Sequence, residues 1–117
     1  MHLRVLRSAA GGGFPHWNCN SPPSPGFPLS PLPAPARTQS SIAVSANAED
    51  WLLVNASPDV LSQIRAHPEL QPARAVRDSG IACVLLMDAQ IDHVTGLLML
   101  RERASPLPLL ATPATKP

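Results

Sequence analysis

The sequence predicts an α/β fold, in which one sheet is covered by helices. After residue 40, short apolar runs of strand length alternate with stretches that have helical spacing, which is typical of layered sheet-and-helix domains. The chain has 117 residues and is 44% hydrophobic, enough for one domain with a buried core. Only 3% of the residues are aromatic and tyrosine is absent, so the core must consist mainly of Leu, Val, Ile and Ala.

Four strands are expected. Leu3–Leu6 is a short apolar run that leads into a glycine-rich turn. Ile42–Val44 and Trp51–Val54 are separated by polar residues, which suits a hairpin. Gly80–Met87 is a continuous apolar run, as expected of a strand that is buried on both faces.

A helix is predicted to begin in the stretch "NASPD". Ser57 is a good N-cap, Pro58 suits the first helical position, and Asp59 suits the first turn. The dipeptide His67–Pro68 marks the end of this helix. A second helix is expected from the spacing of later apolar residues, with Arg101 and Arg103 placed to interact with its C-terminus.

The stretch "MDAQIDHVTG" carries the main candidate site. Asp88 lies just past the C-terminal end of a predicted strand, where ligand sites collect in open sheets. Asp92 follows beside His93, and a carboxylate with an imidazole makes two of the three donors of a 2-His-1-carboxylate iron site. Asp92 is also a good N-cap for the next helix, which would leave His93 without a metal. Spacing alone favours the cap and leaves the metal interpretation as the alternative.

Three further polar residues are candidates. Asn55 follows a strand, has no capping role and could face the same edge of the sheet. Arg37 could bind a carboxylate or phosphate with its planar fork, although a solvated arginine at a strand edge is the commoner case. Cys19 could supply a thiolate, but Ser21 and Ser24 cannot replace sulfur in a structural zinc site.

Composition excludes several classes of protein. The net charge is +1 and the nine Lys and Arg residues are scattered, so no nucleic-acid footprint is expected. No apolar segment approaches the length needed to insert into a bilayer, which predicts a cytoplasmic protein. Of the 15 prolines, eight lie in Pro15–Pro35. Residues 21–36 are therefore expected to form an extended, mobile loop.

Taken together, five stretches resemble the coenzyme PQQ synthesis protein B family. They are "SAAGGGFPHWNCN", "ARTQSSIAVS", "WLLVNASPD", "QPARAVRDSGI" and "DAQIDHVTGLL", in this order. The resemblance covers almost the whole chain apart from the proline-rich stretch. It implies the metallo-β-lactamase fold, an αββα sandwich of two sheets flanked by helices. Residues 1–117 would form the N-terminal part of that domain.

The same resemblance implies a role in making pyrroloquinoline quinone (PQQ), a redox cofactor, from a ribosomal peptide. The family is proposed to hydroxylate tyrosine in the precursor peptide with non-haem iron. The binding partner implied is then this peptide or a PQQ intermediate. For full-length members, the resemblance also implies that a homodimer is possible. Alternatives are a carrier that moves PQQ or its precursor towards the periplasm without chemistry, and an inactive fragment.

The resemblance also changes how the candidate residues are interpreted. Metal-dependent members of the wider superfamily carry His-x-His-x-Asp-His at this strand end. Here Asp88 and Gln90 occupy the two histidine positions, while Asp92 and His93 keep the final pair and become candidate iron ligands. Cys19 matches the start of a Cys-x-Cys-x-x-Cys zinc cluster whose later members are serines here, so the structural zinc is expected to be lost. The pocket would be lined by Asp88, Gln90, Asn55 and Arg37.

Overall fold

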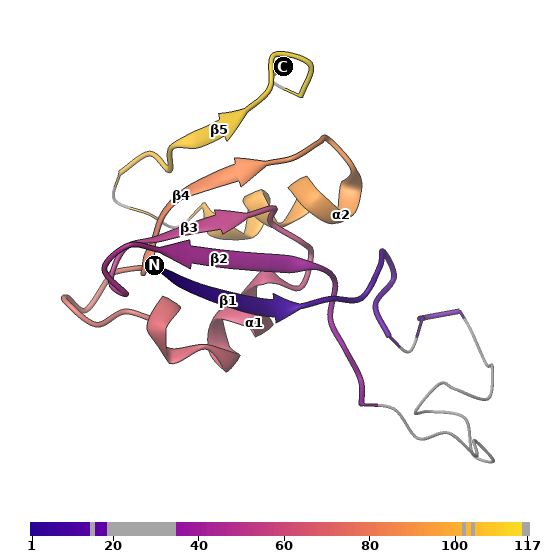
Figure 1. Ribbon diagram of the computed structural model, residues 1–117, viewed down its shortest axis with the longest axis horizontal. Coiled ribbons are helices and arrows are strands. Elements are labelled where there is room, and N and C mark those ends of the chain that lie inside the picture. The colour runs from indigo at the N-terminus through magenta and orange to yellow at the C-terminus, as the bar shows by residue number, and fades with distance from the viewer. Residues whose placement is uncertain (15, 19–34, 102, 104, 116–117) are drawn as a thin grey trace.

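The computed structural model describes residues 1–14, 16–18, 35–101, 103 and 105–115. This part of the chain contains one five-stranded sheet (Figure 1). The strand order is β1-β2-β3-β4-β5; β1–β2 and β2–β3 are antiparallel, whereas β3–β4 and β4–β5 are parallel. Strands β1, β3, β4 and β5 therefore run in the same direction, and their carboxyl ends share one edge, here called the carboxyl edge. The bounds are β1 His2–Arg7, β2 Ser41–Ser45, β3 Trp51–Val54, β4 Ile81–Leu86 and β5 Leu109–Ala111.

The α/β prediction and the four predicted strands are confirmed. The fifth strand, β5, has no counterpart in the sequence prediction. It is only three residues long, and the prolines that surround it suggest a loop. The proline-rich loop predicted over 21–36 lies almost entirely outside the described residues.

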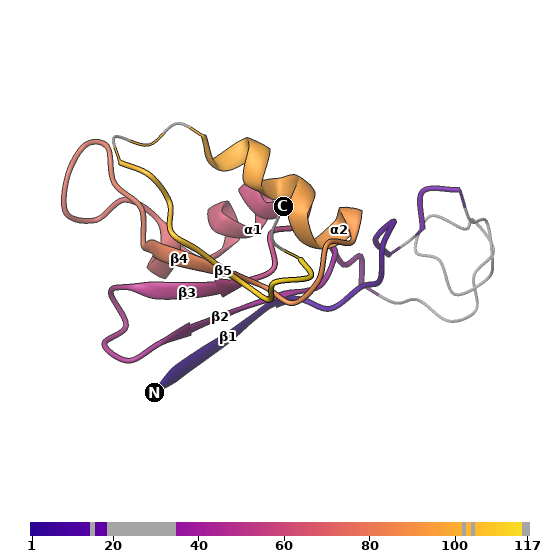
Figure 2. The same ribbon diagram turned by 90° about the horizontal axis from the view of Figure 1, so that it is seen from above.

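All helices of the described residues cover the same face of the sheet (Figure 2). They are the α-helices α1 (Val60–Ala66) and α2 (Ile91–Val94) and the 3₁₀ helices η1 (Pro68–Leu70) and η2 (Thr95–Leu100). The buried core lies between them and the sheet. Within the described residues, no helix combines the length and the apolar character that crossing a bilayer requires. The core residues are Leu6, Ala43, Trp51, Leu53, Ala56, Val60, Leu70, Ile81, Val84 and Leu86.

The opposite face of the sheet is also apolar, and no described helix covers it. Residues paired across neighbouring strands project to the same side of a sheet, so the pairing register defines two apolar rows on this helix-free face. Val5, at one end of a row, is 56% exposed, and Leu110, at its other end, is 52% exposed. The rows are Leu3, Val44, Leu52 and Cys83, and Val5, Ile42, Val54, Leu85 and Leu110.

Helix α1 begins two residues later than predicted. Ser57 Oγ accepts the Asp59 N–H (3.2 Å), as expected of a cap, but Val60 N–H bonds to Ser57 O (3.1 Å) in a turn that precedes the helix. The Asp59 carboxylate accepts instead from the backbone N–H of Gln39 (2.9 Å). The predicted end at His67 is confirmed.

The second predicted helix is broken into α2 and η2. Gly96 donates its N–H to Ala56 O (2.9 Å) in the loop after β3, so this donor is taken from the helical ladder. The prediction is wrong for Arg103, whose Nη1 donates to Ile81 O at the start of β4 (3.1 Å). Arg101 lies exposed at the C-cap of η2, the helix end where it was predicted.

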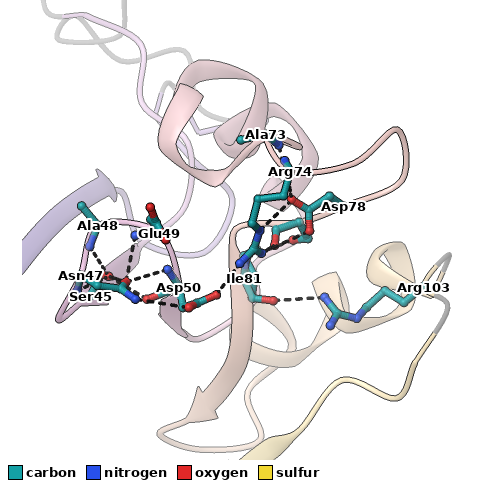
Figure 3. Close-up of polar contacts among 11 residues, drawn as sticks. Ser45, Asn47, Ala48, Glu49, Asp50, Ala73, Arg74, Asp78, Ile81 and Arg103 are labelled. Carbon is teal, nitrogen blue, oxygen red and sulfur yellow. Dashed lines mark hydrogen bonds and ion pairs between the residues drawn. The ribbon is translucent and has the colours of Figure 1, made fainter.

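Arg74 connects the loop before β4 to the turn between β2 and β3 (Figure 3). Its guanidinium donates to Asp50 Oδ1 (2.9 Å), Asp78 Oδ2 (3.1 Å) and Ser79 O (3.0 Å). The bond from Arg74 is the largest cause that lowers the pKa of Asp78 well below its usual range, and the same guanidinium lowers the pKa of Asp50. This network fixes the starts of the two adjacent strands β3 and β4.

The substitution Arg74→Met is expected to reduce stability most at neutral pH. A carboxyl group whose pKa is lowered by folding stabilises the fold fully above its unfolded pKa, and this contribution is lost as the pH falls through the folded pKa. The gap in Tm between wild type and Arg74→Met should therefore narrow on acidification, in thermal melts followed by circular dichroism. The gap should be small because the side chains of Arg74 and Asp50 are each 50% exposed. Arg77→Met is the control, since exposed Arg77 makes no ion pair with the described residues; an equal loss there would contradict the assignment.

The substitution Gly96→Ala is expected to destabilise the protein by about 1–3 kcal/mol or more, because overpacking against rigid groups forces backbone shifts. A Cβ at this position would lie 2.1 Å from Ser57 O and 2.7 Å from Ala56 O. Urea denaturation would measure the loss. Gly11→Ala is the matched control, since its Cβ would meet Asp92 Oδ2 at an ordinary 3.5 Å. Equal stability of the two variants would show that Gly96 does not need this close approach.

Candidate functional site

Asn55 and Asp88 were predicted to lie at one edge of the sheet, and the structure places both at the carboxyl edge. Asn55 Oδ1 accepts the N–H of Met87 (3.0 Å), and its own N–H donates to Leu85 O (2.8 Å). Its backbone has a φ of 63°, a left-handed conformation that Asn adopts more readily than most residues. The side-chain oxygen of this buried residue is thus used to join the ends of β3 and β4.

His93 lies between two carboxylates. Its Nδ1 is 2.6 Å from Asp88 Oδ1, within hydrogen-bond distance, and its Nε2 is 3.6 Å from Asp92 Oδ2. The side chains of His93 and Asp92 are only 19% and 17% exposed, compared with 42% for Asp88. The backbone is fixed as well, because His93 O accepts the Ala56 N–H at 2.7 Å. The ring therefore neither faces open solvent nor packs among leucines.

The capping interpretation of Asp92 was wrong. Gln90 occupies the N-cap position of α2, Asp92 lies in the first turn, and no side chain caps this helix. The carboxylate of Asp92 instead lies beside the His93 ring and against Gly11, whose ideal Cβ position is 3.5 Å from Asp92 Oδ2. The glycine loop after β1 is thus brought to the same place.

Asp88 has two polar partners. Its Oδ1 accepts the backbone N–H of Gln90 (2.9 Å) and faces the His93 ring. These contacts, the Gln90 N–H first and His93 second, lower the pKa of Asp88. The group is therefore a carboxylate throughout the neutral range and can act only as an acceptor.

The geometry allows His93 and Asp92 to share one metal ion. Two donors at about 2.1 Å from one tetrahedral ion are about 3.4 Å apart, close to the 3.6 Å between His93 Nε2 and Asp92 Oδ2. Asp88 is on the opposite ring nitrogen and does not belong to this donor pair. The described ranges contain no group of three or more side chains that could hold a metal, so they supply two donors.

The other predicted site residues do not join this pair. Gln90 is exposed at the start of α2. Arg37 donates from its side chain to Ser8 Oγ (3.4 Å) and pairs through its backbone with Phe14 (2.6 and 2.7 Å), which closes the glycine loop. Cys19 lies outside the described residues.

Two glycines of the site were missed by reasoning from the sequence. Gly96 allows α2 and η2 to approach the loop after β3, and Gly11 brings the glycine loop to Asp92. The triple glycine and the "HVTG" stretch were visible as signals, but a glycine alone does not indicate which segment approaches it.

Two shallow hollows occur on the described part of the molecule, and neither is lined by Asp92 or His93. One of about 430 Å³ lies on the helix-free face between Met1, Leu52 and Cys83. The other, of about 390 Å³, lies between η2 and the segment before β5, where Arg101 and Arg103 line it. Neither hollow therefore extends the candidate site.

Comparison with known proteins identifies the family to which this fold belongs. Residues 50–117 match the family model described as "Beta-lactamase superfamily domain". The chain is 62% identical over 112 residues to coenzyme PQQ synthesis protein B of Azoarcus sp. (strain BH72), covering 96% of this chain and 37% of the relative. It is 64% identical over 110 residues to the protein of the same name from Cupriavidus taiwanensis, covering 94% and 36%. The chain thus spans about a third of the length of these relatives.

Solved structures give the same result. A crystal structure of Zn²⁺-bound PqqB from Methylobacterium extorquens matches with a TM-score of 0.85 and 51% identity, over 97% of this chain and 38% of that one. A diphosphatase from the PhnP family matches with a TM-score of 0.72 and 22% identity, over 97% and 42%, which shows the shared fold alone. The chain therefore belongs to the β-lactamase superfamily. Within this superfamily it resembles coenzyme PQQ synthesis protein B over about a third of that protein's length.

Proposed function

We propose that the chain serves in the biosynthesis of pyrroloquinoline quinone as part of a metal-dependent hydroxylase of tyrosine in the peptide precursor, acting in the cytoplasm. The observation that supports this most is the 62% identity over 96% of the chain to a coenzyme PQQ synthesis protein B. The site adds a second argument, because the matched region includes a partly buried carboxylate–imidazole pair at the carboxyl edge.

In this proposal His93 and Asp92 hold the metal. Their donor set, one imidazole and one carboxylate, is part of the 2-His-1-carboxylate set of non-haem iron oxygenases. When bound, iron supplies the oxygen chemistry that hydroxylation of a phenol requires. The residues of this chain position that ion. Asp92 contributes the negative charge, and the bond from Ala56 to His93 O fixes the backbone of the imidazole donor.

A carrier without chemistry is the second candidate. It is favoured by the donor count, since the described residues provide only two metal donors, and by the loss of two histidines of the superfamily pattern at Asp88 and Gln90. Binding of PQQ to metal-free protein, with no oxygen consumption, would support it. The third candidate, an inactive fragment, predicts that the isolated chain shows no cooperative thermal transition.

The substitution His93→Ala is expected to weaken binding of a divalent metal by more than about tenfold, because it removes one of two protein donors and even outer contacts change affinity by that factor. Anaerobic titration calorimetry with Fe²⁺, and with Zn²⁺ as a redox-inert probe, would measure this. His2→Ala is the control, since exposed His2 begins β1 at the opposite edge of the sheet. Unchanged affinity in His93→Ala would remove His93 from the metal site.

The biological role can be tested in a chimera. In this chimera, the matched third of the Azoarcus protein is replaced by this chain. The chimera is produced in a bacterium whose own gene for coenzyme PQQ synthesis protein B has been deleted. We expect PQQ formation to be restored, and to be lost again with His93→Ala, as measured by mass spectrometry. A chimera that folds and fails to restore PQQ, next to a parent that succeeds, would contradict the proposed role.

A further inference from the structure

We propose that Asp88 is a positioning residue: it fixes the N–H of the neutral His93 ring on Nδ1 and so directs the lone pair of Nε2 toward Asp92. Asp88 stands where the superfamily pattern has a histidine, and this assignment gives it a different task from that of a ligand. That this lone pair binds a metal rests on the function proposed above. Which ring nitrogen carries the N–H does not depend on that function.

The two carboxylates compete for one proton. A neutral imidazole carries a single N–H, on either nitrogen. Asp88 Oδ1 is 2.6 Å from Nδ1, a short hydrogen-bond distance of the kind that an ionised acceptor favours. Asp92 Oδ2 is 3.6 Å from Nε2, beyond the usual hydrogen-bond range. The N–H is therefore favoured on Nδ1.

Asp88 is held in place independently of the ring. Its Oδ1 also accepts the Gln90 N–H (2.9 Å), and the strand end before it is bound through the Met87 N–H to Asn55 Oδ1 (3.0 Å). On the other side, the Ala56 N–H holds His93 O (2.7 Å). Both partners thus meet with little freedom to separate, so the tautomer is set by the fold.

Loss of Asp88 changes the competition at His93. Without the acceptor at Nδ1, the nearest carboxylate is Asp92, and the N–H is free to move to Nε2. After that shift, Nε2 carries the N–H and no longer has a free lone pair with which to bind a metal beside Asp92. Histidines that bind metals generally donate their second N–H to a carboxylate or carbonyl, which fixes the tautomer. Asp88 has this relation to His93.

The test is the tautomer itself, measured on the metal-free 117-residue chain. Long-range ¹H–¹⁵N correlation spectra of the His93 ring, recorded well above the ordinary histidine pKa and assigned with His93→Gln, distinguish the two forms. We expect the N–H on Nδ1 in wild type and mainly on Nε2 in Asp88→Ala. Asp88→Asn keeps an acceptor oxygen and should retain the wild-type form. Asp92→Asn is the matched control and should also retain it.

Two results would overturn the inference: an Nε2–H tautomer in the wild type, or an unchanged Nδ1–H tautomer in folded Asp88→Ala. Should Asp88→Ala not fold, the wild-type spectrum still decides. Zn²⁺ titration gives a second readout, with affinity expected to fall about 10–100-fold in Asp88→Ala and less in Asp88→Asn. A wild-type chain with the expected tautomer but no metal binding would refute the proposed metal function and leave the positioning role intact.

Discussion

Two main-chain hydrogen bonds between the loop after β3 and the segment α2–η2 determine where the candidate site lies. The Ala56 N–H donates to His93 O, and the Gly96 N–H donates to Ala56 O. Together they fix the backbone of α2, the single helical turn that carries His93, against the loop after β3. Because the contact is made by backbone atoms, it depends on the absence of a side chain at Gly96, where a Cβ would lie 2.1 Å from Ser57 O. The short helix, the position of the ring and the break into a 3₁₀ helix all follow from this approach.

Strand direction explains why residues distant in the sequence meet there. The loops that follow β1, β3 and β4 all leave the sheet at the carboxyl edge, which brings Gly11, Asn55 and Asp88 to the same region. One face of this sheet is covered by helices, whereas two apolar rows cross the other. An apolar sheet face is normally covered by another layer. The αββα sandwich of the resemblance has such a layer, and the relatives that match are about two and a half times as long as this chain.

The sequence was sufficient for the elements whose hydrophobic period is clear. Strands β1–β4 were predicted because each contains an apolar run of strand length, and helix α1 because cap residues precede it and a His-Pro pair ends it. Strand β5 was missed, since three residues between prolines carry no period. The single helix expected after Asp92 was also wrong, because Gly96 bonds to a loop about 40 residues away in the chain. Contacts of this kind, like the left-handed turn at Asn55, are set by tertiary structure and have no local pattern.

The site residues show the same division, with a consequence for chemistry. A carboxylate beside an imidazole was recognisable as a donor pair, but spacing alone favoured a cap. The structure contradicts the cap, because Gln90 takes that position and the Asp92 carboxylate lies beside His93. The ligand role of the pair stays a prediction. At the two positions where the superfamily has histidines, Asp88 contacts the far nitrogen of His93 and Gln90 points into solvent. These replacements remove two nitrogen donors of the superfamily pattern, so the described residues leave one candidate donor pair, His93 and Asp92.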